Sequence, residues 1–182
     1  LMEGHTLQQE IRDVTGRGEV FSWPRAAAIT LQICAALNVA HKAKVVHRDI
    51  KPSNCFCVAD EGGADVIKLL DFGIAKVQAG EASEDSLATP LTQEGMFLGT
   101  PHFAAPEVIV QDPEWPVDGR VDIFAVGVMM YLMITGVLPF QGCSKLDVLY
   151  KTVHERPLPP RQRAPTRDIS VEVDALVMTL MA

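Results

Sequence analysis

The residues most able to do chemistry in this sequence stand in one eight-residue stretch, 47–54. The stretch holds a carboxylate, two cationic side chains, an imidazole and an amide: Asp49, Arg48, Lys51, His47 and Asn54. Pro52 and Ser53 favour a loop over a helix, so we expect a loop between two short strands, at Val45–Val46 and at residues 55–58. Packing has little use for so many polar groups, and the stretch therefore predicts a reactive site.

Two later triplets extend this pattern. Asp71-Phe72-Gly73 follows the apolar run 66–70, and Ala105-Pro106-Glu107 comes further along the chain. Residues 55–58 and 66–70 predict two strands joined by a turn at 60–65. Such a hairpin would bring Asn54 and Asp71 to neighbouring strand ends, with both oxygen-bearing side chains facing one cavity. Oxygen ligands of this kind suit Mg²⁺.

The loop and the two triplets, in this order, resemble the C-terminal lobe of the eukaryotic-type protein kinases, and most of all bacterial Ser/Thr kinases. The resemblance implies an α+β, predominantly α-helical, protein kinase-like fold with small β-hairpins beside the catalytic loop. We expect residues 1–182 to be a partial kinase domain, truncated at both ends, with the N-terminal lobe absent.

The resemblance also implies a role for each residue of the site. Asp49 would orient the hydroxyl of a protein substrate and accept its proton, while Lys51 approaches the γ-phosphate of ATP. Asn54 and Asp71 would bind Mg²⁺. Phe56 would lie under the adenine ring, beside a nucleotide site that also includes Ser53. A neutral serine at that place does not favour selection of strongly basic substrates.

Further residues are assigned structural or regulatory roles by the same resemblance. The structural set is His47, Phe72, Gly73, Glu107 and Asp122. Asp122 would hold backbone amides of the catalytic loop, and Glu107 would pair with an arginine beyond residue 182. The regulatory set is Arg48, Thr89, Thr92, Glu94 and Thr100. A phosphate on the polar segment that contains Thr92 would bind Arg48, and Thr100 agrees with Ser/Thr specificity.

Several helices must position this loop. Residues 6–14 and 22–43 carry apolar stripes at helical spacing, with Thr6 and Pro24 suited to helix starts. Residues 121–135 are apolar all round but too short for a membrane span of about 20 residues, so we expect a buried central helix. The remaining predictions are a short helix from Pro106, helices at 144–154 and 171–181, an irregular linker at 156–160, and surface positions for His102, Asp118 and His154.

Composition narrows the classes of function. The chain has 182 residues and a formal net charge of −7, which argues against a general nucleic-acid partner. Four cysteines without metal-binding spacing predict reduced, mostly buried thiols and a cytoplasmic location, although a membrane anchor elsewhere in the parent chain is left open. The expected partners are ATP, Mg²⁺, Ser/Thr-bearing protein substrates and a second kinase molecule for autophosphorylation.

Two alternatives stay open from the residues alone. A small-molecule phosphotransferase of the aminoglycoside-kinase type shares an Asp…Asn…Asp core, but it usually lacks the Gly-Thr-Pro…Ala-Pro-Glu segment. A pseudokinase or scaffold lobe would bind partners without catalysis, against which Asp49, Asn54 and Asp71 argue.

Overall fold

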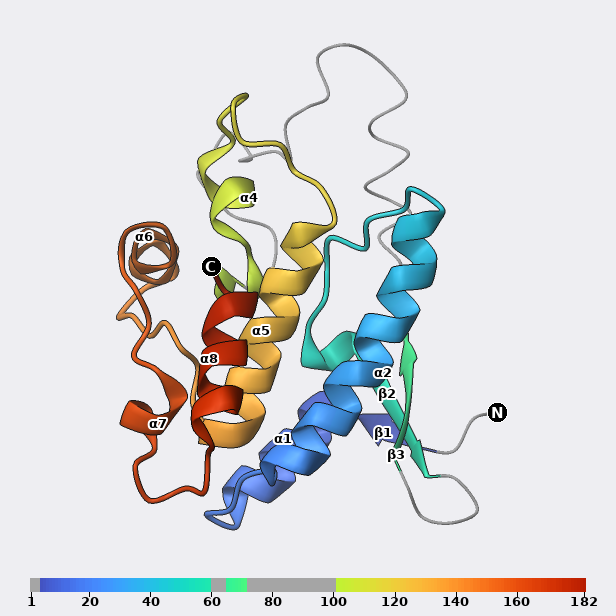
Figure 1. The fold of residues 1–182 in the computed structure, drawn as a ribbon, viewed down its shortest axis with the longest axis vertical. Helices are drawn as coiled ribbons and strands as arrows, with labels where there is room; N and C mark the ends of the chain where they lie inside the picture. The colour runs from blue at the N-terminus through green and yellow to red at the C-terminus, as the bar shows by residue number, and fades with distance from the viewer. Residues whose placement is uncertain (1–3, 60–64, 72–100) are drawn as a thin grey trace.

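The computed structural model describes residues 4–59, 65–71 and 101–182. They form a mostly helical structure with one small antiparallel sheet (Figure 1). The strands are β1 (His5–Thr6), β2 (Cys55–Ala59) and β3 (Asp65–Leu69). The α-helices are α1 (Leu7–Gly16), α2 (Trp23–Lys42), α4 (Pro106–Val110), α5 (Arg120–Thr135), α6 (Lys145–His154), α7 (Pro160–Arg163) and α8 (Val171–Leu180), and the 3-10 helices are η1 (Pro52–Asn54) and η2 (Pro101–Phe103).

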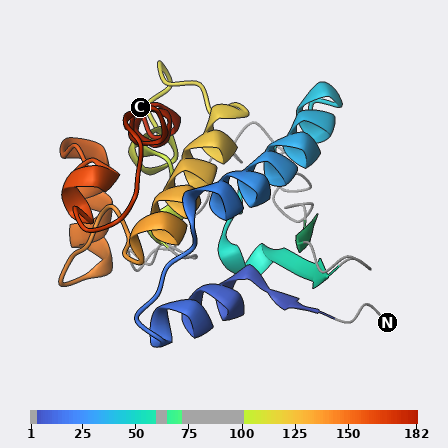
Figure 2. The same cartoon turned by 60° about the horizontal axis from the view of Figure 1, so that its bottom comes forward.

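Helix α5 is the centre of the fold. It lies between α2 and α8 (Figures 1 and 2) and packs against both. Its side chains are buried around almost the whole circumference, as the uniformly apolar sequence predicts. The helix ends where Gly136 takes the left-handed conformation with φ 78° and donates its N–H to the Leu132 carbonyl. Within the described residues, no helix has both the length and the apolar character needed to cross a membrane.

The start of α1 confirms the predicted cap. The Thr6 hydroxyl accepts a hydrogen bond from the Gln9 amide, and the Gln9 side chain accepts one from the Thr6 amide. This reciprocal pair satisfies two backbone donors that a helix N-terminus otherwise leaves open. Leu7, Ile11 and Val14 then form the buried face of the helix.

Helix α2 buries Ala26, Ile29, Ile33 and Leu37 and leads toward the polar stretch 47–54. The strand predicted at Val45–Val46 is wrong, because these residues are not in a strand. The Val45 amide instead bonds to the Ala40 carbonyl at 2.9 Å, and Lys44 is left-handed with φ 61°. The backbone at this point terminates α2, so its hydrogen bonds are used for the helix end.

The sheet has the order β1–β2–β3. The predicted β2–β3 hairpin is confirmed, with Cys55 opposite Leu69 and Phe56 opposite Lys68, while its turn at 60–64 lies outside the described residues. The two-residue strand β1 was not predicted from the sequence, because a pair of residues carries no alternation pattern.

The four cysteines are unbridged, but only Cys55 and Cys57 are buried. They share one face of β2, as predicted, and burial raises the pKa of the Cys55 thiol to about 12 and that of Cys57 to about 11. Cys34 is half-buried and Cys143 is exposed. The prediction of mostly buried thiols therefore holds for only two of the four.

The C-terminal part contains the helices predicted at 144–154 and 171–181, capped by Ser144 and Ser170. The linker between them is not wholly irregular, because Pro160 starts the short helix α7. A proline suits this first position, where its missing N–H breaks no helical hydrogen bond.

His102 is not the surface residue that the sequence suggested. It is half-buried in η2, which packs against α5 and α6. Burial lowers the pKa of His102 below its ordinary value. Asp118 and His154 are exposed, as predicted.

Arg25 ties three elements together. Its guanidinium donates to both carboxylate oxygens of Asp65 on β3, at 2.8 and 3.1 Å, and to Glu10 on α1 at 2.9 Å. The same group lies over the Phe21 ring, 4.6 Å from its centroid. The Arg25 hydrogen bond lowers the pKa of Asp65, so the carboxylate stabilises the fold in its charged form.

We therefore predict a measurable coupling between Arg25 and Asp65. In a double-mutant cycle of Arg25→Gln and Asp65→Asn, urea unfolding at pH 7 should give a coupling free energy of about 1 kcal/mol. The value is modest because solvent screens the two side chains, which are 37% and 28% exposed. The coupling should be fully present above about pH 4, the ordinary pKa of an aspartate, and should be lost as the pH falls through the lowered pKa of Asp65, because the pair requires the ionised carboxylate. Arg17–Glu19, whose side chains are 59% and 63% exposed, is the matched control and should show almost none. Equal couplings for the two pairs would contradict this account.

Candidate active site

The polar stretch 47–54 is attached to the core through Asp122 on α5. One oxygen, Oδ2, accepts the His47 backbone N–H at 2.9 Å, and the other, Oδ1, accepts the Arg48 backbone N–H at 2.8 Å. Asp122 is only 1% exposed. A buried carboxylate is costly unless it is well hydrogen-bonded, and here its two oxygens determine the path of the loop.

The backbone conformation of Arg48 makes this arrangement possible. Its φ of 61° is in the left-handed region, which a non-glycine residue adopts at a cost. Successive N–H groups around such a residue can point toward one anion. The hydrogen bonds to Asp122 offset the strain at Arg48, whose side chain remains exposed.

His41 completes this anchor and was missed in the sequence analysis. Its Nε2 lies 2.7 Å from Asp122 Oδ2. The ring also lies against Gly119, where an added Cβ would stand 2.8 Å from it. The sequence signal was weak, since an imidazole in the last turn of a helix is also favourable simply beside the helix C-terminus.

His47 joins the loop to the hairpin. It is fully buried, and its Nε2 lies 3.1 Å from the Leu70 carbonyl. The Leu70 amide in turn donates to the Asn54 carbonyl at 2.8 Å. These bonds place the exposed residue Asp71 directly beyond a strand end that is hydrogen-bonded to Asn54.

Asp49, Lys51 and Asn54 form one hydrogen-bonded group. Asp49 Oδ2 accepts from Lys51 Nζ and from Asn54 Nδ2, each at 2.9 Å. Asn54 Nδ2 also donates to the Asp49 main-chain carbonyl at 2.9 Å. Oδ1 of Asp49 has no hydrogen bond from the described part of the chain, so this oxygen is available to a substrate group.

The donor set suits a hard cation. Because Asn54 Nδ2 is committed to Asp49, the amide oxygen Oδ1 is directed elsewhere and has only a 3.5 Å contact from the Ser53 hydroxyl. The Asp71 carboxylate is the second oxygen donor. No group of three or more His, Cys, Asp or Glu side chains suited to a metal occurs among the described residues. Mg²⁺ commonly takes one or two protein oxygens and completes its shell with phosphates and water.

Residues 1–182 match the protein-family model described as "Protein kinase domain". The chain belongs to the protein kinase family.

Curated bacterial kinases are similar along almost the whole chain. It is 35% identical over 174 residues to "Serine/threonine-protein kinase pkn3" of Myxococcus xanthus, covering 96% of this chain and 30% of that protein. It is 38% identical over 176 residues to "Probable serine/threonine-protein kinase PknB" of Corynebacterium glutamicum, covering 96% and 25%. It is 32% identical over 172 residues to PknB of Mycobacterium tuberculosis, covering 94% and 25%. The kinase chain thus spans 25–30% of the length of these relatives.

Of the other residues that the kinase resemblance singled out, the structure describes Phe56 and Glu107. Phe56 is half-buried on β2, and its ring lies close to Gly4, where a Cβ would stand 2.8 Å from it. Glu107 is half-buried in the first turn of α4. The remaining predicted positions lie outside the described residues: Phe72, Gly73, Thr89, Thr92, Glu94 and Thr100.

The anchor geometry predicts the effect of removing one acceptor from Asp122. Asp122→Asn keeps the shape of the side chain but replaces one carboxylate oxygen with a donor, so one loop amide loses its partner. We expect the free energy of unfolding of the kinase to fall by about 1–3 kcal/mol, with faster hydrogen exchange at the His47 and Arg48 amides. Asp13→Asn, at an exposed position on α1 without a side-chain hydrogen bond or ion pair to the described residues, is the control and should change stability by less than about 0.5 kcal/mol. Unchanged exchange at both amides in Asp122→Asn would show that the carboxylate does not hold the loop.

Proposed function

We propose that this chain is the C-terminal lobe of a protein Ser/Thr kinase, which transfers the γ-phosphate of ATP to serine or threonine hydroxyls of protein substrates. The observation that carries the proposal is the hydrogen-bonded group of Asp49, Lys51 and Asn54, held beside Asp71. The relatives that are named serine/threonine kinases support the same class of acceptor.

Asp49 is the residue that contacts the acceptor hydroxyl in this proposal. One of its oxygens is held by Lys51 and Asn54, which leaves Oδ1 to accept the hydroxyl hydrogen bond. As the substrate oxygen forms its bond to phosphorus and the bond to the ADP oxygen breaks, the hydroxyl proton passes to Asp49. Because the two donors prevent rotation of the carboxylate, the acceptor oxygen is positioned before the substrate arrives.

Asn54 and Asp71 are the residues that would hold Mg²⁺. When bound, the ion neutralises charge on the nucleotide phosphates. Lys51 would add a positive charge to that of the ion. Its ammonium group lies 2.9 Å from Asp49 Oδ2. A single lysine beside the acceptor base can approach the transferred phosphoryl group while it still orients the base.

The proposal predicts different effects for the two acids. Asp49→Asn should lower kcat by about 10²–10⁴-fold, because the proton acceptor is lost, while Mg²⁺-ATP affinity stays within a few-fold. Asp71→Asn should weaken Mg²⁺-ATP binding because it removes a charged ligand. Both are measured on the full-length protein by steady-state kinetics with a serine peptide and by nucleotide titration.

Asp13→Asn, an exposed acid on α1, is the matched control and should leave both quantities unchanged. Near-normal phosphorylation of a protein substrate by Asp49→Asn would contradict the assignment of Asp49 as the proton acceptor.

We further propose that Thr92 is a regulatory phosphorylation site that acts through Arg48. The Arg48 side chain is exposed and makes no hydrogen bond or ion pair with the described residues, so it can receive a phosphate bidentately. Glu94 would supply a permanent negative charge in the same segment. Thr89 is a second candidate acceptor, and Thr100 would come to lie near Asp49.

Phosphopeptide mapping of the full-length kinase should find phosphate on residues 83–92, and Thr92→Ala should lower activity several-fold. Thr166→Ala, at an exposed threonine between α7 and α8, is the control and should be silent. Full activity in Thr92→Ala, with no phosphate on residues 83–92, would end the regulatory proposal without affecting the assignment of Asp49.

A further inference from the structure

A cavity of about 220 Å³ lies between the end of α5, the end of α6 and the segment that links α6 to α7. Its apolar lining comes from Tyr131, Pro139, Phe140, Pro157 and Leu158. Tyr131 and Phe140 are buried, whereas Leu158 is 52% exposed at the surface. The cavity thus has an apolar floor in which an incoming side chain can contact the half-buried Pro139 and Pro157 and the exposed Leu158, whereas Tyr131 and Phe140 offer it little surface.

Tyr131 adds little polarity to this floor. Its hydroxyl donates to the Leu158 carbonyl at 3.0 Å, and burial raises the pKa of the phenol to about 12. The hydroxyl is therefore neutral and already hydrogen-bonded, so the polar character of the site comes from the residues around it.

Those residues are mainly cationic. Lys151, Arg156 and Arg163 line the cavity together with a single acid, Glu155. Lys151 is engaged, since its Nζ donates to the Gln141 carbonyl at 2.9 Å and lies 3.4 Å from Asp147. Arg156 and Arg163 are exposed, and neither guanidinium makes a hydrogen bond or ion pair with any residue that the structure describes.

Asp147 and Glu155 offset part of this positive charge, so the feature that sets the cavity apart is its two guanidinium groups without partners among the described residues. Two guanidinium groups without protein partners, above an apolar floor, are suited to a carboxylate or phosphate that is carried next to an apolar side chain. The charge complementarity therefore favours an acidic peptide segment.

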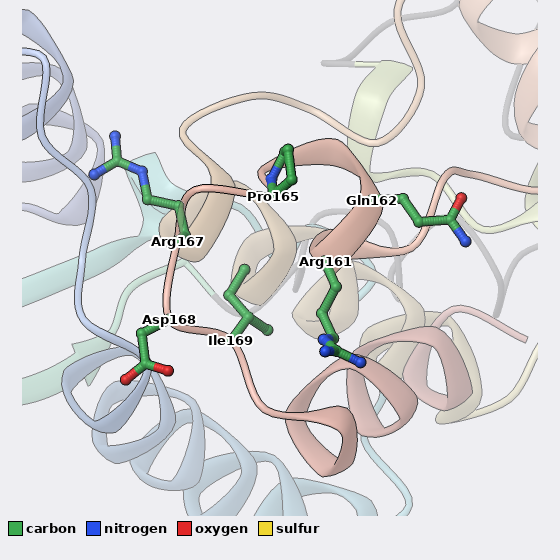
Figure 3. Close-up of a pocket in the computed structure, with 6 residues that line it drawn as sticks. All are labelled: Arg161, Gln162, Pro165, Arg167, Asp168 and Ile169. Carbon is green, nitrogen blue, oxygen red and sulfur yellow. The ribbon is translucent and has the colours of Figure 1, made fainter.

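The neighbouring hollow does not offer the same convergence. It has a volume of about 480 Å³ and is lined in part by Arg161, Arg167 and Asp168. Figure 3 shows the Arg161 and Arg167 side chains pointing in different directions. Arg167 also donates to the Gly18 carbonyl at 3.3 Å, so the charges in this hollow are dispersed.

We propose that the cavity lined by Arg156 and Arg163 is a docking site for an acidic segment of the protein substrate, an inference that rests on the function proposed above. Tyr131 lies nine positions after Asp122, the residue beneath the catalytic loop, which corresponds to about 14 Å along α5. An extended peptide needs roughly four or more residues to cover that distance. The site would therefore raise substrate affinity without touching the reacting atoms.

A peptide fits these observations better than a membrane surface or a nucleic acid. The arginines border a cavity of side-chain size, whereas extended polyanions are bound by broad basic faces. The overall negative charge of the chain would repel such a polyanion outside this small region.

The test uses the full-length kinase and two fluorescent peptides with the same serine acceptor. One peptide carries three glutamates beyond a flexible spacer of about six residues, and the other carries three glutamines. We expect the glutamate peptide to have a KM and a Kd about tenfold lower, the magnitude of two exposed charge pairs. Arg156→Gln/Arg163→Gln should remove that difference while kcat and the KM of the glutamine peptide stay unchanged.

Arg12→Gln, at an exposed arginine on α1, is the matched control and should keep the preference. Equal affinity of the wild-type protein for the two peptides, or a preference that survives the double variant, would overturn the docking site even if phosphate transfer is normal. Anisotropy without ATP reads binding separately, so an arginine-dependent preference without transfer would support the docking site and refute the kinase function. Arginine-dependent binding of anionic vesicles or duplex DNA, with no peptide preference, would overturn the proposal in favour of a polyanion surface.

Discussion

The rest of the structure depends on the hydrogen bonds between the buried carboxylate of Asp122 and the loop. Two consecutive backbone amides donate to its two oxygens, so the rigid helix α5 determines the path of the loop. A carboxylate with 1% exposure persists only where its hydrogen bonds are nearly complete. The two parts therefore depend on each other: the loop amides need the carboxylate as their acceptor, and the buried carboxylate needs the amides as donors.

The surrounding helices hold Asp122 and the loop in position. Helix α2 delivers the chain to the loop and supplies His41 as a further partner of the acid. Helix α5 has no exposed stripe of its own and is covered by α2 and α8 (Figure 1). The Arg25 cluster then joins α1, α2 and β3, so the sheet that leads to Asp71 is tied to the same helices. Packing therefore fixes the supports, and short polar contacts orient the reactive groups.

The reactive loop and the proposed docking cavity are separated along α5. The loop is at the end near Asp122, and the cavity is at the end near Tyr131. In the proposed docking, this separation would permit substrate selection to vary through Arg156 and Arg163 without disturbing the oxygens of Asp49. The polar groups of the loop are positioned by Asp122, which stands on a rigid helix whose own composition is almost entirely apolar.

The sequence by itself determined the longer helices, the β2–β3 hairpin and the family. Capping residues, apolar periodicity and the order of the motifs are local properties, so α1, α2, α5 and the β2–β3 pair followed from them. The contributions of distant residues could not be predicted in this way. The strand expected at Val45–Val46 is absent because its backbone terminates α2, and the contact between His41 and Asp122 joins residues 81 positions apart. The tertiary structure alone decided which side of Asp49 is open and which arginines meet in a cavity, because these depend on distances between segments that no local pattern records.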